Sequence, residues 1–182
     1  MKIVFVDAIT TNPGDVSLSC IEALGEFIAF DRTEPQELIG RVSDADILIS
    51  NKVIIGDHEL EQLPNLKYIV VAATGYNNID IEAARKRNIP VSNVRNYSTE
   101  SVVQQLFASL LSVLNKPEYY NTEVKKGRWS ATSDFCFYDH SIPPLSSLTF
   151  GIIGLGNIGQ KVKEVATSFG MQVLDASVRE VK

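Results

Sequence analysis

The chain has 182 residues, and its 17 lysines and arginines against 22 aspartates and glutamates give a formal net charge of −5. Nucleic-acid binding draws on clustered cations, so this scattered and outnumbered basic set argues against a nucleic-acid partner. With 45% apolar and 21% charged residues, the composition is that of an ordinary folded protein and not of a disordered, collagen-like or coiled-coil chain. The length fits one large or two small domains.

Location is constrained by three features of the sequence. The longest apolar stretches, at 68–73 and 102–114, do not reach the about 20 uninterrupted apolar residues of a bilayer span, so no membrane insertion is expected. The N-terminus reaches Asp7 too soon to contain the apolar core of a signal peptide. Cys20 and Cys136 are too few for a disulfide framework or a cysteine metal site. These features predict a cytoplasmic protein without a bound metal.

The first half of the chain alternates short runs of Val, Ile and Leu with segments of helical period, which is typical of βαβ units and an α/β fold with a parallel sheet. Strands are expected at 2–6, 26–29, 47–49, 66–71 and 91–93. Helices are expected at 16–24, 35–41, 57–63 and 80–86, with starts at Asp15, Thr33, Gly56 and Asp80. One α/β layer is therefore complete by about residue 93.

A longer helix is expected at 99–114, with residues 98–101 as its capping region. Its apolar stripe is Val103, Leu106, Phe107, Leu110, Leu111 and Leu114, and Val102 and Val113 widen it. A helix apolar over so much of its surface is usually buried on two sides, which places it between domains or between subunits. Pro117 ends it, and 118–147 is expected to form a short helix and an irregular aromatic arm that packs on another surface.

The last segment contains a glycine motif in a specific setting. A buried-type strand at 148–153 runs into GLGNIG at 154–159, which opens a helix at 157–169 and is followed by a strand at 172–174. This context favours the first βαβ unit of a dinucleotide-binding domain, whereas the glycines alone are weak evidence. Gly154 would make the tight turn, Gly156 would let a pyrophosphate approach the backbone, and Gly159 would bring the helix close to the strand. The alternative is a glycine-rich turn without a ligand.

The same motif predicts an acid about 20 residues further on, which would bind the ribose hydroxyls. Asp175, Ser177 and Glu180 compete for this position. Ser177 with the nearby Arg179 suits a 2′-phosphate better than a carboxylate does, so NAD and NADP both remain open.

A second constellation is AATGYNNID at 72–80, a strand end that passes through a glycine turn into a helix. Exposed backbone amides at such a turn form an anion-binding nest, and a small carboxylate is the expected ligand. Asn51 and Lys52 follow the neighbouring strand and are expected to bring an amide and an ammonium to the same crevice, because ligands bind off the carboxyl ends of parallel strands. The alternative for Lys52 is a solvated loop lysine.

Five segments in order resemble the D-isomer-specific 2-hydroxyacid dehydrogenases, most closely the glycerate dehydrogenases that reduce hydroxypyruvate. They are SNK, AATGYNNID, NYSTES, GRWSATSDFCFYDH and FGIIGLGNIGQ, and the resemblance covers nearly the whole chain. The resemblance implies a flavodoxin-like substrate domain at 1–98. It also implies that 99–182 holds a dimerisation helix and arm and the start of an incomplete Rossmann NAD(P)-binding domain, with a homodimer interface at 99–147.

Carried over by residue, the resemblance places a substrate carboxylate on the backbone of Ala73, Thr74 and Gly75, with Asn51 and Lys52 close by. It places the pyrophosphate at Asn157 and Ile158 and the nicotinamide near Gln104. The implied reaction interconverts a 2-keto acid, hydroxypyruvate or glyoxylate, and a D-2-hydroxy acid, D-glycerate or glycolate, with NAD or NADP.

The chain departs from the family pattern at Arg95 and Asn96 in the hinge, at Gln105 and at Ser177. The family's catalytic Arg, Glu and His are expected after residue 182, so these 182 residues alone are expected to be inactive. A shortened, non-catalytic homologue that dimerises or regulates is the alternative from another functional class.

Overall fold

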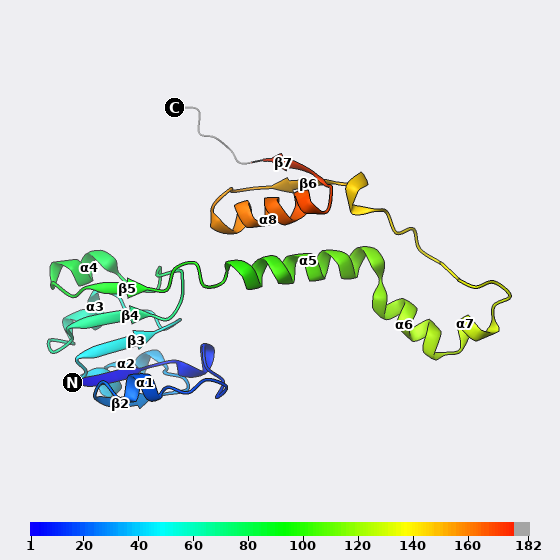
Figure 1. Ribbon diagram of the computed structural model, residues 1–182. Helices are drawn as coiled ribbons and strands as arrows, with labels where there is room; N and C mark the ends of the chain where they lie inside the picture. The colour runs from blue at the N-terminus through cyan, green and yellow to red at the C-terminus, as the bar shows by residue number, and fades with distance from the viewer. Residues whose placement is uncertain (177–182) are drawn as a thin grey trace. The chain divides into compact units, whose positions relative to one another are not determined.

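A computed structural model describes residues 1–176 and divides the chain into two compact units, Met1–Arg95 and Asn96–Lys182 (Figure 1). The first unit ends just before the boundary at residue 98 that the sequence suggests. Within the described residues, no helix combines the length and the apolar character that a membrane span requires.

The first unit is built on a five-stranded sheet in which every neighbouring pair is parallel. The strands are β1 (Lys2–Phe5), β2 (Glu26–Ala29), β3 (Ile47–Ser50), β4 (Tyr68–Val71) and β5 (Val91–Asn93), in the order β2-β1-β3-β4-β5. The predicted α/β fold with a parallel sheet is thus confirmed. This order changes direction between β1 and β3, as in flavodoxin, and such a sheet presents ligand-binding loops at the carboxyl ends of its strands.

Helices cover the two faces of this sheet unequally. The four helices are α1 (Ser19–Glu22), α2 (Pro35–Val42), α3 (Asp57–Glu61) and α4 (Ile81–Lys86). Leu38, Leu60 and Ala83 of α2, α3 and α4 pack with strand residues such as Leu48 and Ile69 in the larger core. The opposite face holds a smaller core around Ile3, Phe5 and Ile49, to which α1 contributes Ile21.

Two predicted helix starts are wrong, and tertiary contacts explain one of them. Thr33 does not cap α2, because its hydroxyl is buried and donates to the Val6 carbonyl at 2.6 Å. Glu34 takes the cap instead and forms a reciprocal capping box with Glu37. The first helix is also shorter than predicted and starts after Leu18, not at Asp15.

The predicted starts at Gly56 and Asp80 are confirmed. Gly56 caps α3, with its amide donating to Glu59 at 2.8 Å. The Asp80 carboxylate caps α4 by accepting from the Ala83 amide at 2.9 Å.

The second unit packs a long helix on a small βαβ unit. Its elements are α5 (Thr99–Asn115), α6 (Pro117–Lys125), α7 (Arg128–Ala131), β6 (Thr149–Ile152), α8 (Asn157–Ser168) and β7 (Gln172–Asp175). Strands β6 and β7 are parallel and α8 connects them. Phe107 of α5 is buried and stacks on Phe150 and Phe169, with ring centroids 6.1 and 5.6 Å apart. The predicted long helix is confirmed, and one part of its apolar surface is buried within this unit.

The arm that follows α6 folds back on it, with the Tyr119 hydroxyl of α6 donating to the Asp139 carboxylate. The Arg128 guanidinium lies over the Phe137 ring at 4.5 Å and forms two bonds with the Asp139 carboxylate at 2.5 and 2.7 Å. Several large apolar side chains of the arm remain exposed, with Phe135 at 88% and Tyr138 at 81%.

Candidate functional site

Asp7 organises the carboxyl end of the first unit's sheet. It directly follows the apolar run of β1 and is buried at 3% exposure. Its carboxylate accepts backbone amides from three successive residues of the loop after β3, namely Asn51 at 2.9 Å, Lys52 at 2.6 Å and Val53 at 3.1 Å. A carboxylate that accepts several amides fixes their orientation strongly. The loop that carries Asn51 and Lys52 is therefore held from β1.

Asn51 and Lys52 have different surroundings in this loop. Asn51 is buried, and its side-chain amide donates to the Thr10 hydroxyl at 2.8 Å. Lys52 is exposed and lines a hollow of about 480 Å³ together with Arg32 and Val53. Lys52 is thus one of the residues that line this hollow, whereas the Asn51 side chain is bonded within the protein.

The loop after β3 lies against the loop after β4. The Asn78 side chain donates to the Val53 carbonyl at 3.0 Å. Ile55 and Ile79 form a parallel bridge between the two loops. The structure therefore brings the Asn51–Lys52 loop beside the glycine turn, as expected from their positions after neighbouring strands.

The turn at Ala73, Thr74 and Gly75 is held by its carbonyl and hydroxyl groups. The Thr74 carbonyl accepts from the Asn93 side chain at 2.7 Å, and the Thr74 hydroxyl donates to the Val94 carbonyl at 3.0 Å. Among residues 1–176, the backbone amides of Ala73, Thr74 and Gly75 have no acceptor. Successive amides without acceptors at a strand end are an anion-binding arrangement.

The glycine turn of the second unit has the geometry that its motif requires. Gly154 adopts φ +90°, a left-handed conformation that glycine permits. A side chain at Gly159 would place its Cβ 2.1 Å from the Gly154 carbonyl oxygen, so helix and strand end approach too closely for any other residue. A Cβ at Gly156 would meet nothing within 4 Å, which leaves open space above the turn.

The start of α8 can receive a phosphate group. Gly156 is its N-cap residue and supplies no side chain, so no side chain caps the helix. Ile158 in the first turn is 39% exposed. Unsatisfied first-turn amides and the helix dipole favour an anion at such a terminus. The turn therefore fits the pyrophosphate of a dinucleotide.

The other residues predicted to bind the cofactor do not all present a side chain at this turn. The Asn157 side chain donates to Asn96 Oδ1 at 2.6 Å, so only its backbone is available at the turn. Gln104 is exposed on α5, next to Val103, which is buried against α8. Ser177, Arg179 and Glu180 lie outside the described residues. Asp175 ends β7 and pairs in register with Ile152.

Sequence reasoning missed Asp7 and Asn93 as supports of this site. The available signals were an acid directly after the first buried strand and an amide side chain at the end of the fifth. Each bonds to a residue that is distant in the chain. The Asn51 amide, which donates to Asp7, is 44 positions away, and the Thr74 carbonyl, which accepts from Asn93, is 19 positions away.

Comparison with known proteins assigns the family. Residues 3–150 match the model of the D-isomer specific 2-hydroxyacid dehydrogenase catalytic domain, and the chain belongs to this family. It is 41% identical to a hydroxypyruvate reductase of Blautia hydrogenotrophica over 96% of this chain and 55% of that protein. It is 33% identical to a glycerate dehydrogenase of Methylorubrum extorquens over 95% of this chain and 54% of the relative.

Solved structures agree with this assignment. An acyclic imino acid reductase (Bsp5) in complex with NADPH and D-Arg superposes with a TM-score of 0.77 at 31% identity, covering 100% of this chain and 58% of the other. A D-lactate dehydrogenase from Aquifex aeolicus, complexed with NAD and lactic acid, gives 0.72 at 25% identity, covering 98% and 52%. The chain spans about half the length of the curated relatives it matches.

Proposed function

We propose that this chain is the substrate-carboxylate and dinucleotide-phosphate binding part of an NAD(P)-dependent 2-hydroxyacid dehydrogenase. The reaction would interconvert hydroxypyruvate or glyoxylate and D-glycerate or glycolate. The observation that carries the proposal is the turn after β4, where the amides of Ala73, Thr74 and Gly75 have no acceptor among the described residues. The names of the relatives, a hydroxypyruvate reductase and a glycerate dehydrogenase, support this substrate class.

In this mechanism the first unit holds and orients the acid. The three amides donate to the carboxylate, which fixes the direction of the adjoining carbonyl group. The loop pinned by Asp7 brings Lys52 to the strand ends, where its ammonium adds positive charge for an anionic substrate. We assign Asn51 to the support of this loop, because its side chain is bonded to Thr10.

The second unit would hold the cofactor. Gly154, Gly156 and Gly159 shape the turn, and the amides of Asn157 and Ile158 would meet the pyrophosphate. We place Gln104 beside the nicotinamide and Ser177 beside the adenosine ribose. When bound, NADH or NADPH supplies the hydride.

The proton donor for the carbonyl oxygen is not assigned to either histidine. His58 lies in α3 and contacts Gln62 at 3.2 Å, and His140 packs on Tyr119 in the arm at 4.8 Å. Ketone reduction needs an acid at the oxygen and a cation that holds it. We therefore propose that residues 1–182 bind but do not turn over.

A binding experiment with the 182-residue chain tests the carboxylate turn. Oxamate, an unreactive 2-keto acid analogue, is titrated by calorimetry into the chain and into two variants of one position. Gly75→Pro removes an amide, whereas Gly75→Ala keeps it, and its added Cβ would lie 3.5 Å from Asn77 Oδ1 in ordinary contact. We expect Gly75→Pro to weaken oxamate about tenfold and Gly75→Ala to bind like the parent chain. Equal binding by all three would contradict the proposal.

Activity is tested on the protein as isolated from its source. Its intact mass is compared with the 20.1 kDa of these residues, and it is assayed with hydroxypyruvate and with both NADH and NADPH. A larger mass with turnover that depends on one of the two cofactors would support the proposed reaction, whereas a mass equal to 20.1 kDa would favour the non-catalytic homologue. Steady turnover by the 182-residue chain would refute the assignment of catalysis to other residues.

We further propose homodimerisation through the surface of α5 and the arm, residues 99–147. The support is the exposure of large side chains there, including Trp129 at 54% and Phe135 at 88%. Size-exclusion chromatography with light scattering measures the oligomeric state of the chain. We expect the double variant Phe135→Ser, Tyr138→Ser to be more monomeric than the parent chain. A dimer that binds neither oxamate nor NAD(P)H would favour the non-catalytic homologue instead.

A further inference from the structure

A second hollow lies in the first unit, away from the strand-end loops that hold Lys52. It has a volume of about 530 Å³ and lies against α4, the following turn and β5. Strand β5 is at the edge of the sheet. The lining residues are Tyr76, Ile81, Arg85, Asn88, Ile89, Pro90, Val91, Ser92 and Asn93. This size is in the range of small-molecule sites.

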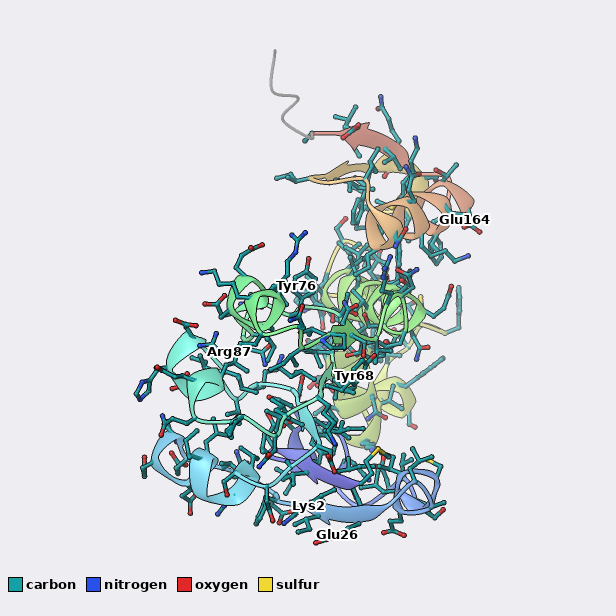
Figure 2. All side chains as sticks on the ribbon, turned by 90° about the vertical axis from the view of Figure 1, so that its left-hand side faces the viewer. Lys2, Glu26, Tyr68, Tyr76, Arg87 and Glu164 are labelled. Carbon is teal, nitrogen blue, oxygen red and sulfur yellow. The ribbon has the colours of Figure 1, made fainter. Side chains whose placement is uncertain are left out.

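The charge of the hollow is unbalanced. Arg85 is exposed in the last turn of α4 and is the one ionisable cation of the lining, which contains no aspartate or glutamate. Within residues 1–176, no carboxylate lies within ion-pair distance of Arg85. Arg87, two positions later and labelled with Tyr76 in Figure 2, is by contrast paired with Asp57 at 2.6 Å. Arg85 is thus available to an external anion.

The rest of the lining is suited to a ligand with an apolar body. Ile89 is buried, Ile81 and Val91 are half-buried, and all three pack with the larger core, which makes this wall rigid. Polar groups complete the rim, and neither the Asn88 side chain nor the Ser92 hydroxyl has a hydrogen-bond partner among the described residues. A guanidinium beside a fixed apolar wall matches a carboxylate attached to a hydrocarbon group.

We propose that this hollow binds a small monocarboxylate with an apolar body, at a site separate from the amide turn at residues 73–75. The Arg85 guanidinium pairs with the carboxylate, and the hydrocarbon part lies on Ile81, Ile89 and Val91. The two sites are neighbours, because Asn93 lines the hollow and also donates to the Thr74 carbonyl. The inference does not rest on the proposed reaction.

The test titrates benzoate into the 182-residue chain, with benzamide as the neutral analogue, while saturating oxamate occupies the amide turn. Arg85→Gln is compared with Lys86→Gln, a matched control that removes the same charge from the adjacent exposed position outside the lining. We expect Arg85→Gln to weaken benzoate about tenfold or more, Lys86→Gln to leave it unchanged, and benzamide to bind at least about tenfold more weakly than benzoate.

Nuclear magnetic resonance locates the bound benzoate. The methyl signals of Ile81 and Val91 are expected to shift on titration, and Gly75→Pro is expected to leave these shifts unchanged. Equal benzoate affinity of Arg85→Gln and the parent chain would overturn the proposal, as would equal weakening by Lys86→Gln. Shifts confined to residues 73–75 would also overturn it and would assign the carboxylate to the amide turn. Loss of oxamate binding with retained benzoate binding would count against the proposed function alone.

Discussion

The two units each present a turn between a strand and a helix that we propose binds an anion, but the two turns are stabilised differently. In the second unit the turn depends on glycines a few positions apart, and the approach of Gly159 to the Gly154 carbonyl leaves no space for a side chain. In the first unit the turn depends on contacts from elsewhere, with Asn93 on the Thr74 carbonyl and Asp7 on the neighbouring loop. The conformation of the turn in the second unit therefore follows from the spacing of its glycines, whereas that of the turn in the first unit depends on contacts with residues distant in the chain.

Gly159→Ala is expected to have the largest effect, because it breaks the turn that depends on local spacing. The added Cβ would lie 2.1 Å from a backbone oxygen, which cannot rotate away as a side chain would. We expect the unfolding free energy of the second unit to fall by about 3 kcal/mol or more, the upper end of the usual cost of overpacking, because the clash is with backbone. Amide hydrogen exchange across β6, α8 and β7 measures it.

Gly156→Ala is the matched control within the same turn. Its Cβ would meet nothing within 4 Å, so stability should be preserved while the methyl group occupies the space proposed for the pyrophosphate. We expect normal exchange protection and weaker NAD(P)H binding. If Gly159→Ala matched Gly156→Ala in protection, the close approach would not be a determinant of this unit.

Asp7→Asn is expected to have the next largest effect and acts on the turn region that depends on tertiary support. It replaces a charged acceptor of three amides by a group that presents an N–H to at least one of them. We expect a loss of about 1.5–3 kcal/mol in unfolding free energy, the scale of a hydrogen bond to a charged group, together with weaker oxamate binding. Chemical denaturation and calorimetry measure the two quantities.

Asp15→Asn provides the comparison for Asp7→Asn. Asp15 is an exposed carboxylate that caps no helix, so its variant changes the net charge equally without touching the loop. A similar destabilisation by both variants would show that charge, not the Asp7 contacts, causes the effect.

Asn93→Ala removes one hydrogen bond from the Thr74 carbonyl and leaves the turn's two bonds with Val94 in place. We expect a cost of about 0.5–1.5 kcal/mol and a roughly two- to tenfold weaker affinity for oxamate. Asn65→Ala, which removes an exposed 3.4 Å bond to the Ser43 carbonyl away from the turn, is expected to leave oxamate binding unchanged. If both variants bound oxamate like the parent chain, Asn93 would not position the turn.

The same distinction decides how much the sequence could predict. Apolar runs located the five strands and the long helix, and glycine spacing indicated the turn at 154–159, because these features depend on nearby residues. Capping at α2 could not be decided locally, since Thr33 and Glu34 are both possible caps and only the distant Val6 carbonyl directs Thr33 elsewhere. The role of Asp7 requires the pairing of β1 with β3, which brings residues 44 positions apart into contact.

Acid titration of the arm is expected to give the smallest effect. The Arg128 guanidinium holds the pKa of Asp139 at about 2, below its ordinary value of 3.8, and the Tyr119 hydroxyl adds to this stabilisation of the charged form. A carboxyl whose folded pKa is lowered stabilises the fold above its ordinary pKa, and this contribution is lost as the pH falls toward 2. We therefore expect the Trp129 fluorescence of the arm to change between about pH 4 and pH 2.

Asp139→Asn should abolish the change, whereas Asp134→Asn, which alters an exposed carboxylate of the same arm, should retain it. A change that persists in Asp139→Asn would assign it to another group, and Glu123 is the first candidate because it also pairs with Arg128, at 3.4 Å.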